Sequence, residues 1–481
     1  MEKLSNATLA RVPADVAAPR DRRPVTIGIV HFGPGAFHRA HQAAYVDALL
    51  DRDPRWGIAV VSMRSRGTID ALAAQDGLYT LAIRDAESGF RVIGAHRRFL
   101  SPDDASETQA LLADPAVGLV TSTVTEKGYC LAADGTLDLA HPDIVHDLAG
   151  AGTPRSLVGW IVAGLAARRA AGTMPFVVMP CDNLANNGAK LRAALVAFAR
   201  ARDPELADGI DATLDVRSTM VDSITPASDA ALEEAVSAAL GRLTDAAPVQ
   251  REAFTQWVIE DNGRPLGPDL GAVGATLTDD VAGYERAKLR ILNGSHSTLA
   301  YAGLLRGHDS VAAAMADPAL AGFVEAMIRD EVAPILPDVP GLDLAAYGAA
   351  VLARFRNPVI VHRLDQIAQD GSQKLPYRLG DTLAVHRAEG RMPRHVVAVL
   401  GCWIAFLITR AKAGTPIVDP AGERLAAIAK GGDPLAVTSR LAEAAIGFHP
   451  GLFEDAAVIE AIATAAGDAL AGRWDRLLGA A

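Results

Sequence analysis

The chain has 481 residues, half of them apolar and 21% charged, so it is too long for one ordinary core and two or more domains are expected. The formal net charge of −11 without a Lys/Arg block argues against nucleic acid as a partner, and the absence of a run of about 18 uncharged apolar residues argues against a membrane span. The N-terminal segment has no apolar export signal and the three cysteines have no metal-ligand spacing, so a reducing cytoplasm is the expected compartment.

The first expected strand covers residues 25–31 and leads through a glycine turn into a helical pattern over 40–50. This order is typical of the opening of a dinucleotide-binding βαβ unit. The glycines let the backbone turn tightly and approach a pyrophosphate, while the following helix offers free N–H groups. The usual third glycine is replaced by His38, and a plain structural turn is the alternative. The candidate cofactor-binding residues of this loop are Gly33, Gly35, Ala36 and Phe37.

The end of the second expected strand, residues 57–62, bears on the choice of cofactor. An NAD site usually places Asp or Glu there to accept from the ribose hydroxyls, but no carboxylate occurs before Asp70. Arg64 and Arg66 stand there instead, which fits an adenosine 2′-phosphate, stacking on adenine, or plain surface arginines. We take Arg64 as a candidate cofactor contact, and the choice between NAD and NADP stays open.

Strand and helix patterns alternate through the first part of the chain, and helical patterns dominate afterwards. Further strands are expected at 119–124 and 176–179, with helices at 106–112 and 156–170 between them. The alternation predicts an α/β fold, with a Rossmann-type doubly wound, mostly parallel sheet over residues 1–283. A mainly α-helical domain is expected over 284–481. Its helical patterns cover 284–305, 312–315, 319–332, 396–412 and 456–471.

A polar cluster follows the strand at 176–179 and contains Asp182 and Asn183. Open α/β sheets bind ligands at the carboxyl ends of their strands, so Asn183 is a candidate donor to a substrate carbonyl oxygen. A helix N-cap at Asp182 or Asn183 is the alternative. Asp222, ahead of a proline turn, is a candidate contact for a substrate hydroxyl, with a structural role as the alternative.

The segment from Lys288 to His296 carries the strongest signal of catalysis. On an α-helix, with about 100° per residue, Asn293 lies at about 140° and His296 at about 80° from Lys288, so three polar groups share one side of an apolar helix. A buried lysine can act as general acid/base between an alcohol and a ketone, while Asn293 and His296 hold the oxygen. Glu285, one turn earlier, can tune the lysine. A solvated lysine with a capping asparagine is the alternative.

Segments spread over nearly the whole chain resemble the polyol-specific long-chain dehydrogenase family and follow its order. The most specific is the KxxxxNxxH element at 288–296. The matching segments are GPGAFHRAHQ (33–42), TVTEKGYC (123–130), CDNLANNG (181–188), VDSITPA (221–227), QWVIEDN (256–262), KLRILNGSHS (288–297) and DGSQKLP (370–376).

The resemblance implies a Rossmann-type domain followed by a largely helical domain, NAD as the usual cofactor, no metal, and a monomer or simple homo-oligomer. The residues it implies are Lys288 as general acid/base, Asn183 and Asn293 at the substrate oxygen, His296 orienting the substrate, and Asp222 and Lys374 facing substrate hydroxyls. The arginines at 64 and 66 depart from the family, which often has a carboxylate near that strand's end.

The sequence leaves the substrate open between two classes: a polyol with its ketose, of the D-mannitol and D-fructose type, and the pair D-fructuronate and D-mannonate. A hexuronate brings a carboxylate that needs a cation. The candidate cations are His362, Arg363, Lys374 and Arg378. The expected partner is a small-molecule sugar alcohol, ketose or hexuronate. A cofactor-binding sensor without catalysis is a minor rival, because Lys288 and Asn293 are both present.

Overall fold

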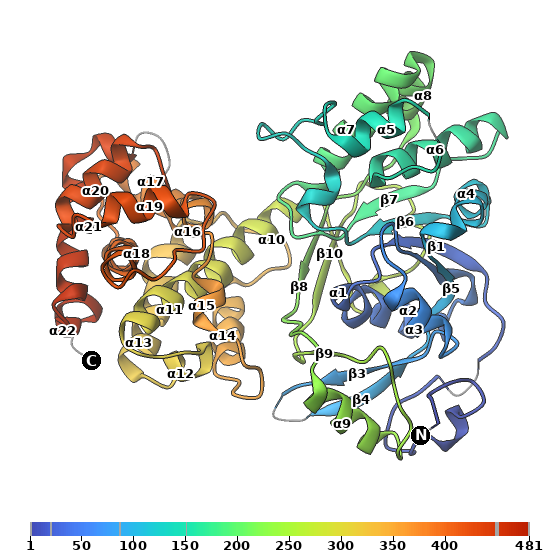
Figure 1. Cartoon of the computed structure of the whole chain (residues 1–481), viewed down its shortest axis with the longest axis horizontal. Helices are drawn as coiled ribbons and strands as arrows, with labels where there is room; N and C mark the ends of the chain where they lie inside the picture. Colours follow the sequence, from blue (N-terminus) through green and yellow to red (C-terminus); the bar gives the residue numbers. More distant parts are fainter. Residues whose placement is uncertain (1, 20–21, 86–87, 151, 448–451, 480–481) are drawn as a thin grey trace. The chain divides into compact units, whose positions relative to one another are not determined.

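A computed structural model describes residues 2–19, 22–85, 88–150, 152–447 and 452–479 of the chain (Figure 1). The chain divides into two compact units, Met1–Val281 (unit 1) and Ala282–Ala481 (unit 2). The sequence analysis placed this division between residues 283 and 284. Each unit is described by itself below.

Unit 1 is built on a central sheet in which every pair of neighbouring strands is parallel. Its strands are β1 (Ile27–Phe32), β2 (Gly57–Val61), β5 (His96–Leu100), β6 (Leu119–Ser122) and β7 (Val177–Pro180). The spatial order of the strands is β5-β2-β1-β6-β7. Along the chain, β2 and β5 are added on one side of β1, and β6 and β7 are then added on the other side. The strand order therefore reverses between β1 and β6, which is where such sheets bind dinucleotides at their carboxyl edge. The predicted doubly wound parallel sheet is confirmed.

Helices cover both faces of this sheet, which explains why a strand such as β2 is a continuous apolar run. The helices of unit 1 are α1 (Ala36–Ala40), α2 (Gln42–Leu50), α3 (Gly67–Ala73), α4 (Ala105–Ala113), α5 (Pro142–Leu148), α6 (Leu157–Ala170), α7 (Asn187–Arg202), α8 (Pro204–Thr213) and α9 (Ala230–Ala239). Because side chains alternate along a strand, Ile29 packs into one core with α2 and α3. Val30 and Phe32 pack into another core with α4, α6 and α7.

Two small three-stranded sheets complete unit 1, and the sequence analysis did not predict them. One has the order β4-β3-β9 and the other β11-β10-β8. Their strands are β3 (Tyr79–Ile83), β4 (Gly89–Ile93), β8 (Thr219–Asp222), β9 (Val249–Arg251), β10 (Gln256–Glu260) and β11 (Thr276–Thr278). Strands as short and polar as Val249–Arg251 carry too little apolar alternation to be recognised.

Unit 2 is helical, and its described residues form no strand, as the sequence predicted. Its helices are α10 (Val281–Ala287), α11 (Gly294–Leu305), α12 (Val311–Met315), α13 (Pro318–Ala326), α14 (Leu344–Phe355), α15 (Leu364–Ile367), α16 (Gly371–Leu375), α17 (Asp381–Ala388), α18 (Arg394–Lys412), α19 (Gly422–Ala429), α20 (Pro434–Glu443), α21 (Ala456–Leu470) and α22 (Trp474–Leu478).

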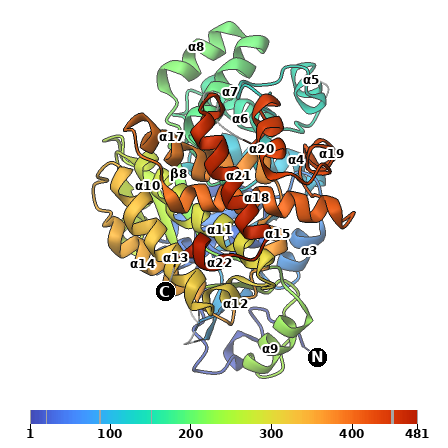
Figure 2. The ribbon, with the colours of Figure 1, turned by 90° about the vertical axis from the view of Figure 1, so that its left-hand side faces the viewer.

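The longest helix of unit 2, α18, forms the centre of its core. It packs against α21, which crosses it (Figure 2), and the contact is so close that a Cβ at Gly401 would lie 2.5 Å from the Ala465 Cβ. By length and composition α18 is the one helix of the described chain that could cross a membrane, but 72% of its apolar window is buried inside the protein. Its apolar character is accounted for by this burial.

Three π-helical turns interrupt the helices of unit 2, at Lys288–Asn293, Met327–Val332 and Pro376–Gly380. The helices predicted over 284–305 and 319–332 are present, but each contains a π turn, which the value of 100° per residue used from Lys288 to His296 does not describe. A π turn bonds i to i+5 and widens the helix, so the angular positions calculated for Lys288 and Asn293 do not hold within it. Such turns are frequent at functional sites.

Candidate active site

The glycine loop of unit 1 has the geometry that a dinucleotide requires. Gly33 has φ +104°, and a Cβ there would collide with the carbonyl of Thr123. Around Gly35, by contrast, no atom lies within 4 Å of where a Cβ would stand, so the backbone is open to a ligand. Gly35 precedes α1, whose N-terminus has no side-chain cap. The N–H groups of the first turn, at Ala36 and Phe37, are thus placed to meet a phosphate.

A buried histidine that the sequence analysis passed over holds this loop. The His31 Nε2 lies 3.0 Å from the Gly33 carbonyl oxygen, and its Nδ1 lies 2.7 Å from the Thr121 hydroxyl. Because a carbonyl only accepts, Nε2 carries the proton and Nδ1 accepts from Thr121. Burial lowers the pKa of His31 to about 3, so the ring is neutral. Its signal in the sequence was a lone polar residue in an apolar strand.

His38, which replaces the third glycine, stacks on His31 with ring centroids 3.4 Å apart. Its Nε2 lies 2.9 Å from Nε2 of His96, and all three rings are buried. Burial lowers the pKa of each ring well below its ordinary value. The loop therefore rests on a set of neutral imidazoles rather than on a third glycine.

The two arginines after β2 are already paired with carboxylates. Arg64 lies 3.2 Å from Asp143, and Arg66 pairs with Asp103 and lies 3.6 Å from Asp70. All of these arginine side chains are exposed. Each guanidinium thus has an acidic neighbour, which reduces the positive charge left for a 2′-phosphate.

The polar cluster after β7 does not cap a helix, which was the alternative interpretation of Asp182 and Asn183. Helix α7 begins after Asn186, which makes no side-chain cap, so an N-cap at Asp182 or Asn183 is wrong. Asp182 is buried and instead accepts hydrogen bonds from the Thr125 N–H (2.7 Å) and the Tyr129 hydroxyl (2.8 Å). Asn183, beside it, is exposed at the carboxyl end of β7.

Asp222 is the last residue of β8 and is buried. It lies opposite Gln256 in the antiparallel pair of β8 with β10. Asn183 and Asp222 both belong to unit 1, whereas the lysine segment belongs to unit 2.

The lysine segment brings its three polar residues to the start of α11. Lys288 is buried at the first position of the π turn, Asn293 ends that turn, and His296 is buried one turn into α11. The pKa of His296 is held well below its ordinary value by burial and then by the positive charges around it, Lys288 among them. The ring is therefore neutral and lies within the electrostatic reach of Lys288.

The ring of His296 is packed but not fully bonded. Its centroid lies 4.4 Å from that of Phe355 and 4.8 Å from that of His362. Its Nε2 has no hydrogen-bond partner among the described residues, although the atom is buried. A buried ring nitrogen without a partner is costly, and a hydroxyl or carbonyl of a ligand would satisfy it.

Arg378 is a cation beside this segment. Its guanidinium donates to the Ser297 hydroxyl (3.1 Å) and the Asn293 carbonyl (3.4 Å), and no described carboxylate forms an ion pair with it. Burial lowers its pKa to about 10, so it stays charged at neutral pH. Lys374 lies one turn earlier, donates to the Gln369 carbonyl at 2.7 Å, and has a pKa lowered by burial and by Arg378.

The predicted cation Arg363 is engaged elsewhere. It is exposed, and its guanidinium makes two hydrogen bonds of 3.0 and 2.7 Å with the Asp365 carboxylate. The pKa of Arg363 is raised by those bonds. His362 is half-buried and packs against His296.

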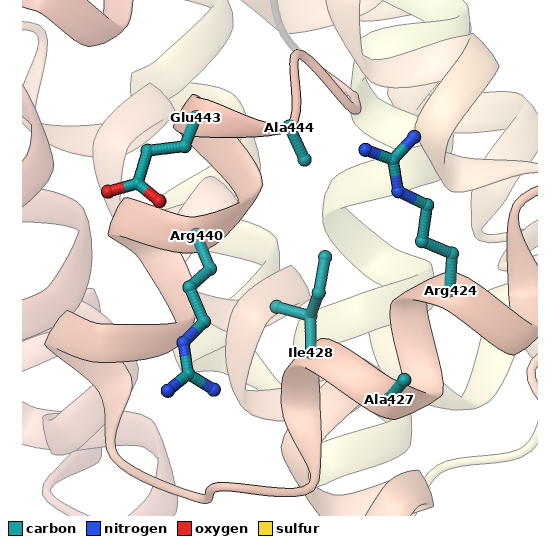
Figure 3. Close-up of a pocket in the computed structure, with 6 residues that line it drawn as sticks. All are labelled: Arg424, Ala427, Ile428, Arg440, Glu443 and Ala444. Atoms are coloured by element: carbon teal, nitrogen blue, oxygen red, sulfur yellow. The ribbon is translucent and has the colours of Figure 1, made fainter.

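A surface pocket of about 430 Å³ lies in unit 2 between α19 and α20 (Figure 3). Its lining residues are Arg424, Ala427, Ile428, Arg440, Glu443 and Ala444. None of them belongs to the residues that sequence analysis singled out. The pocket is open to solvent and is lined by two arginines, a glutamate and small or apolar side chains.

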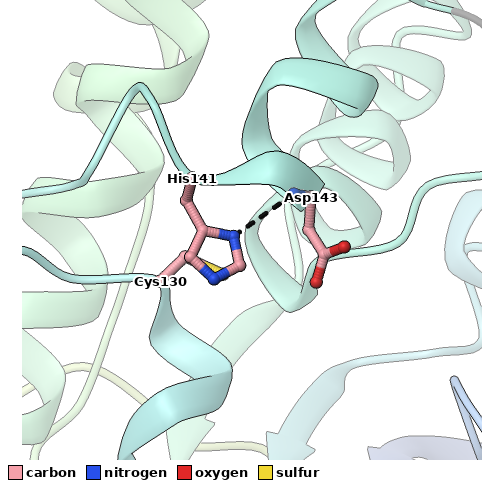
Figure 4. A group of neighbouring side chains, drawn as sticks. All are labelled: Cys130, His141 and Asp143. Atoms are coloured by element: carbon pink, nitrogen blue, oxygen red, sulfur yellow. Dashed lines mark hydrogen bonds between the residues drawn. The ribbon is translucent and has the colours of Figure 1, made fainter.

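Cys130, His141 and Asp143 form a cluster whose ligand-type atoms lie within 4.8 Å of one another (Figure 4). His141 is the N-cap of α5, and its Nδ1 accepts from the Asp143 N–H at 3.2 Å, which places the ring proton on Nε2. The Asp143 carboxylate pairs with Arg64, and burial raises the pKa of the Cys130 thiol to about 11. These features favour a helix cap beside an ion pair over a metal site.

Known proteins match the chain along its whole length. The family model "Mannitol dehydrogenase Rossmann domain" matches residues 27–268, and "Mannitol dehydrogenase C-terminal domain" matches 280–469. The D-mannonate oxidoreductase of Escherichia coli is 42% identical over 402 residues, which cover 82% of each chain.

Two solved structures are similar over nearly all of the chain. A Pseudomonas fluorescens mannitol 2-dehydrogenase, solved with NAD and D-mannitol, has a TM-score of 0.83 at 35% identity and covers 99% of this chain and 98% of its own. A D-sorbitol dehydrogenase in substrate-free form has a TM-score of 0.90 at 32% identity and covers 99% of both.

Proposed function

The chain belongs to the mannitol dehydrogenase family, and from that premise we propose that it is an NAD-dependent dehydrogenase with Lys288 as general acid/base. It interconverts a secondary alcohol and a ketone on an open-chain sugar, of the D-mannitol and D-fructose type. The observation that carries the proposal is the buried Lys288 in a π turn near His296, whose buried Nε2 has no hydrogen-bond partner in the part of the chain that the structure describes. A cytoplasmic monomer or simple homo-oligomer is proposed with it.

NAD is proposed as the cofactor on the geometry of unit 1. The open backbone at Gly35, the uncapped start of α1 and the reversal of strand order between β1 and β6 fit a dinucleotide. The pairing of Arg64 and Arg66 with acids favours NAD over NADP. Bound NAD would supply the acceptor of a hydride.

The proton chemistry is assigned to Lys288. In the oxidative direction the alcohol carbon gives up a hydride and its hydroxyl proton passes to the uncharged amine of Lys288. In the reductive direction the ammonium returns that proton to the new alkoxide. A lysine inside the fold can exist as the free amine more readily than an exposed one, because burial disfavours the charged form.

The substrate oxygen needs donors that are neutral and fixed. The Asn293 side-chain amide and the neutral ring of His296 both follow Lys288 in the chain and are proposed to supply such groups. Lys374 is proposed to face a substrate hydroxyl. Asn183 and Asp222, in unit 1, receive their proposed roles, at the carbonyl oxygen and at a hydroxyl, from the resemblance alone.

A second candidate function is oxidoreduction of an acidic sugar of the D-mannonate and D-fructuronate type. Arg378 favours it, because its half-buried guanidinium lies next to the lysine segment and its partners among the described residues are a hydroxyl and a carbonyl, both neutral. A substrate carboxylate would complete its hydrogen bonds and balance its charge. Arg363, paired with Asp365, is a poorer candidate for that role.

A panel of steady-state rates tests both candidates. Mannitol, sorbitol, arabinitol and mannonate are offered with NAD or NADP, and fructose and fructuronate with the reduced cofactors. A kcat/KM highest for mannitol and fructose supports the first candidate, and one highest for mannonate and fructuronate supports the second. No turnover of any of these substrates would contradict the proposed function.

A further inference from the structure

Thr125 has a backbone conformation that a β-branched residue rarely adopts. Its φ is +67° and its ψ 164°, and it lies just beyond the carboxyl end of β6. A positive φ costs a β-branched residue free energy, which the surrounding structure must supply. The segment 123–130 ends with a second non-glycine residue at positive φ, Cys130, at +53°. Something must hold this segment, which we call the β6 loop, in its shape.

Asp182 is the group that holds it. The buried carboxylate accepts from the Thr125 N–H at 2.7 Å, the Tyr129 hydroxyl at 2.8 Å and the Ser122 hydroxyl at 3.5 Å. No described cation forms an ion pair with it, so only neutral donors stabilise its charge. A backbone N–H donating to a carboxylate is among the stronger hydrogen bonds in proteins.

The β6 loop is tied directly to the glycine loop. The Thr123 N–H donates to the Phe32 carbonyl at 2.8 Å, and the Thr123 hydroxyl donates to the Gly33 carbonyl at 2.9 Å. The two loops follow β1 and β6, the strands between which the strand order reverses. A change in the β6 loop therefore acts on the backbone that is open to a dinucleotide.

We propose that Asp182 is a positioning residue for the cofactor: ionised, it holds the strained β6 loop against the glycine loop, and protonated, it releases that loop and weakens dinucleotide binding. The inference rests on the proposed function, because it needs a dinucleotide at this edge of the sheet. Protonation turns one acceptor oxygen into a donor, so at least one of the three donors loses its acceptor or must reverse its bond, and the remaining bonds lose the strength that the negative charge gives them.

The charge state of Asp182 changes within a pH range that experiments on the folded protein can reach. Burial raises its pKa to about 6, against the lowering effect of the bonds from Tyr129 and Thr125. The titratable groups that face it are Tyr129 and Cys181, and burial raises the pKa of both, so neither ionises near neutrality. Glu126 and Lys127, in the same loop, are exposed. The cofactor affinity is therefore expected to fall as the pH drops through about 6.

The test is a fluorescence titration of the full-length protein with NADH between pH 5 and pH 8, with thermal unfolding measured at each pH. Wild-type affinity is expected to fall below about pH 6. Asp182→Asn is expected to bind about 10-fold more weakly at pH 7.5 and to show no such pH dependence, because it lacks the ionised acceptor. A variant that follows the wild-type pH profile would overturn the proposal.

Asp245→Asn is the matched control. Asp245 is another buried carboxylate of unit 1 that accepts from a backbone N–H, at Thr80, and from neutral side chains, but it lies beside β3 and not at the β6 loop. Its replacement is expected to lower the unfolding temperature and leave the pH profile of NADH binding unchanged. An equal loss of affinity in both variants would reduce Asp182 to a general structural role and overturn the inference.

Thr125→Gly tests the strain itself. Glycine adopts a positive φ at no steric cost, so the loop then needs less restraint. The double variant Thr125→Gly/Asp182→Asn is expected to recover most of the NADH affinity that Asp182→Asn loses, and no recovery would contradict the proposal. If Asp182→Asn does not fold, Tyr129→Phe decides: with one donor fewer, the midpoint of the wild-type pH profile shifts upward, and an unchanged midpoint overturns the inference.

The two proposals fail in different ways. Wild-type protein that binds neither NADH nor NADPH at any pH contradicts the proposed function, and this inference with it. Wild-type protein that binds NADH equally from pH 5 to pH 8 contradicts only the role of Asp182.

Discussion

The Arg378 guanidinium lies 3.1 Å from the hydroxyl oxygen of Ser297, the residue that follows His296 on α11. Through this contact a cation lies beside the proposed general acid/base segment, and within the described ranges of the chain its hydrogen-bond partners are a hydroxyl and a carbonyl. A charge in that position is stabilised best by an anionic ligand. The position of the Arg378 guanidinium in unit 2 therefore bears on whether the substrate is a neutral or an acidic sugar.

Arg378→Gln is expected to change substrate choice. The ratio of kcat/KM for fructuronate to that for fructose should fall by about 10-fold or more, because a charge-assisted hydrogen bond to the carboxylate is lost. Steady-state rates with the two ketoses measure it. Arg363→Gln is the control, since that arginine is exposed and paired with Asp365. Equal ratios in wild type and Arg378→Gln would remove Arg378 from substrate recognition.

His31→Phe is expected to weaken both the fold and NADH binding. The variant removes the His31 bond to the Gly33 carbonyl, which keeps the Thr123 hydroxyl as donor, and it leaves the buried Thr121 hydroxyl without its acceptor. A buried polar group left unsatisfied costs about 1–3 kcal/mol of unfolding free energy. Chemical denaturation and NADH titration measure the two effects. His146→Phe, at a half-buried histidine on α5, serves as control. Unchanged NADH affinity would contradict the role of His31 in the glycine loop.

Arg66→Ala is expected to leave the kcat/KM for NAD within about 3-fold of wild type and to create no preference for NADP, since surface ion pairs contribute little. Arg66 pairs with Asp103 and Asp70, so its charge is already balanced. Rates with both cofactors check this. A wild-type preference for NADP that disappears in the variant would show that Arg66 binds a 2′-phosphate.

Glu331→Gln is expected to destabilise unit 2 in a pH-dependent way. Glu331 accepts from the N–H groups of His395 and Val396 at the start of α18. Burial acts to raise its pKa, but the bonds from His395 and the backbone outweigh burial and lower it from its ordinary 4.5. A lowered carboxyl pKa stabilises the fold above pH 4.5, and this stabilisation is lost as the pH falls through the folded-state pKa.

Denaturation at pH 7 should therefore show a loss of about 1–3 kcal/mol in Glu331→Gln, and the loss should shrink below pH 4. Glu389→Gln, at an exposed glutamate paired with Arg391, is the control. A loss that stays constant from pH 7 to pH 4 would contradict the assignment of a lowered pKa to Glu331.

The parallel sheet could be predicted because its strands are buried on both faces. Gly57–Val61 is apolar throughout, so it stands out in the sequence. His96–Leu100, equally part of the sheet, has three polar residues among its five and was missed. In the small sheets the short strand Val249–Arg251 was missed for the same reason. A pattern of apolar and polar residues reveals a strand only where the buried side chains are apolar. A strand whose buried polar side chains find partners in the fold lacks that pattern.

The site could be predicted only where its residues are neighbours in the sequence. Lys288, Asn293 and His296 form a local motif, although an apolar pattern over one turn cannot distinguish a π turn from an α turn. Asp182 acquires its role from Thr125, 57 residues earlier in the chain, and the sequence alone gives no sign of that contact. Whether Arg378 forms an ion pair likewise depends on which carboxylates the fold places near it, and the sequence alone does not give this.

Lys288→Ala provides the most direct test of the central claim. With NADH affinity measured by fluorescence and turnover measured on the best substrate of the wild-type panel, the variant should bind NADH as wild type does and lose at least about 10³-fold in kcat, since both proton transfer and a nearby electrostatic contribution disappear. Near wild-type turnover in Lys288→Ala, with NADH bound normally, would contradict the assignment of Lys288 as general acid/base.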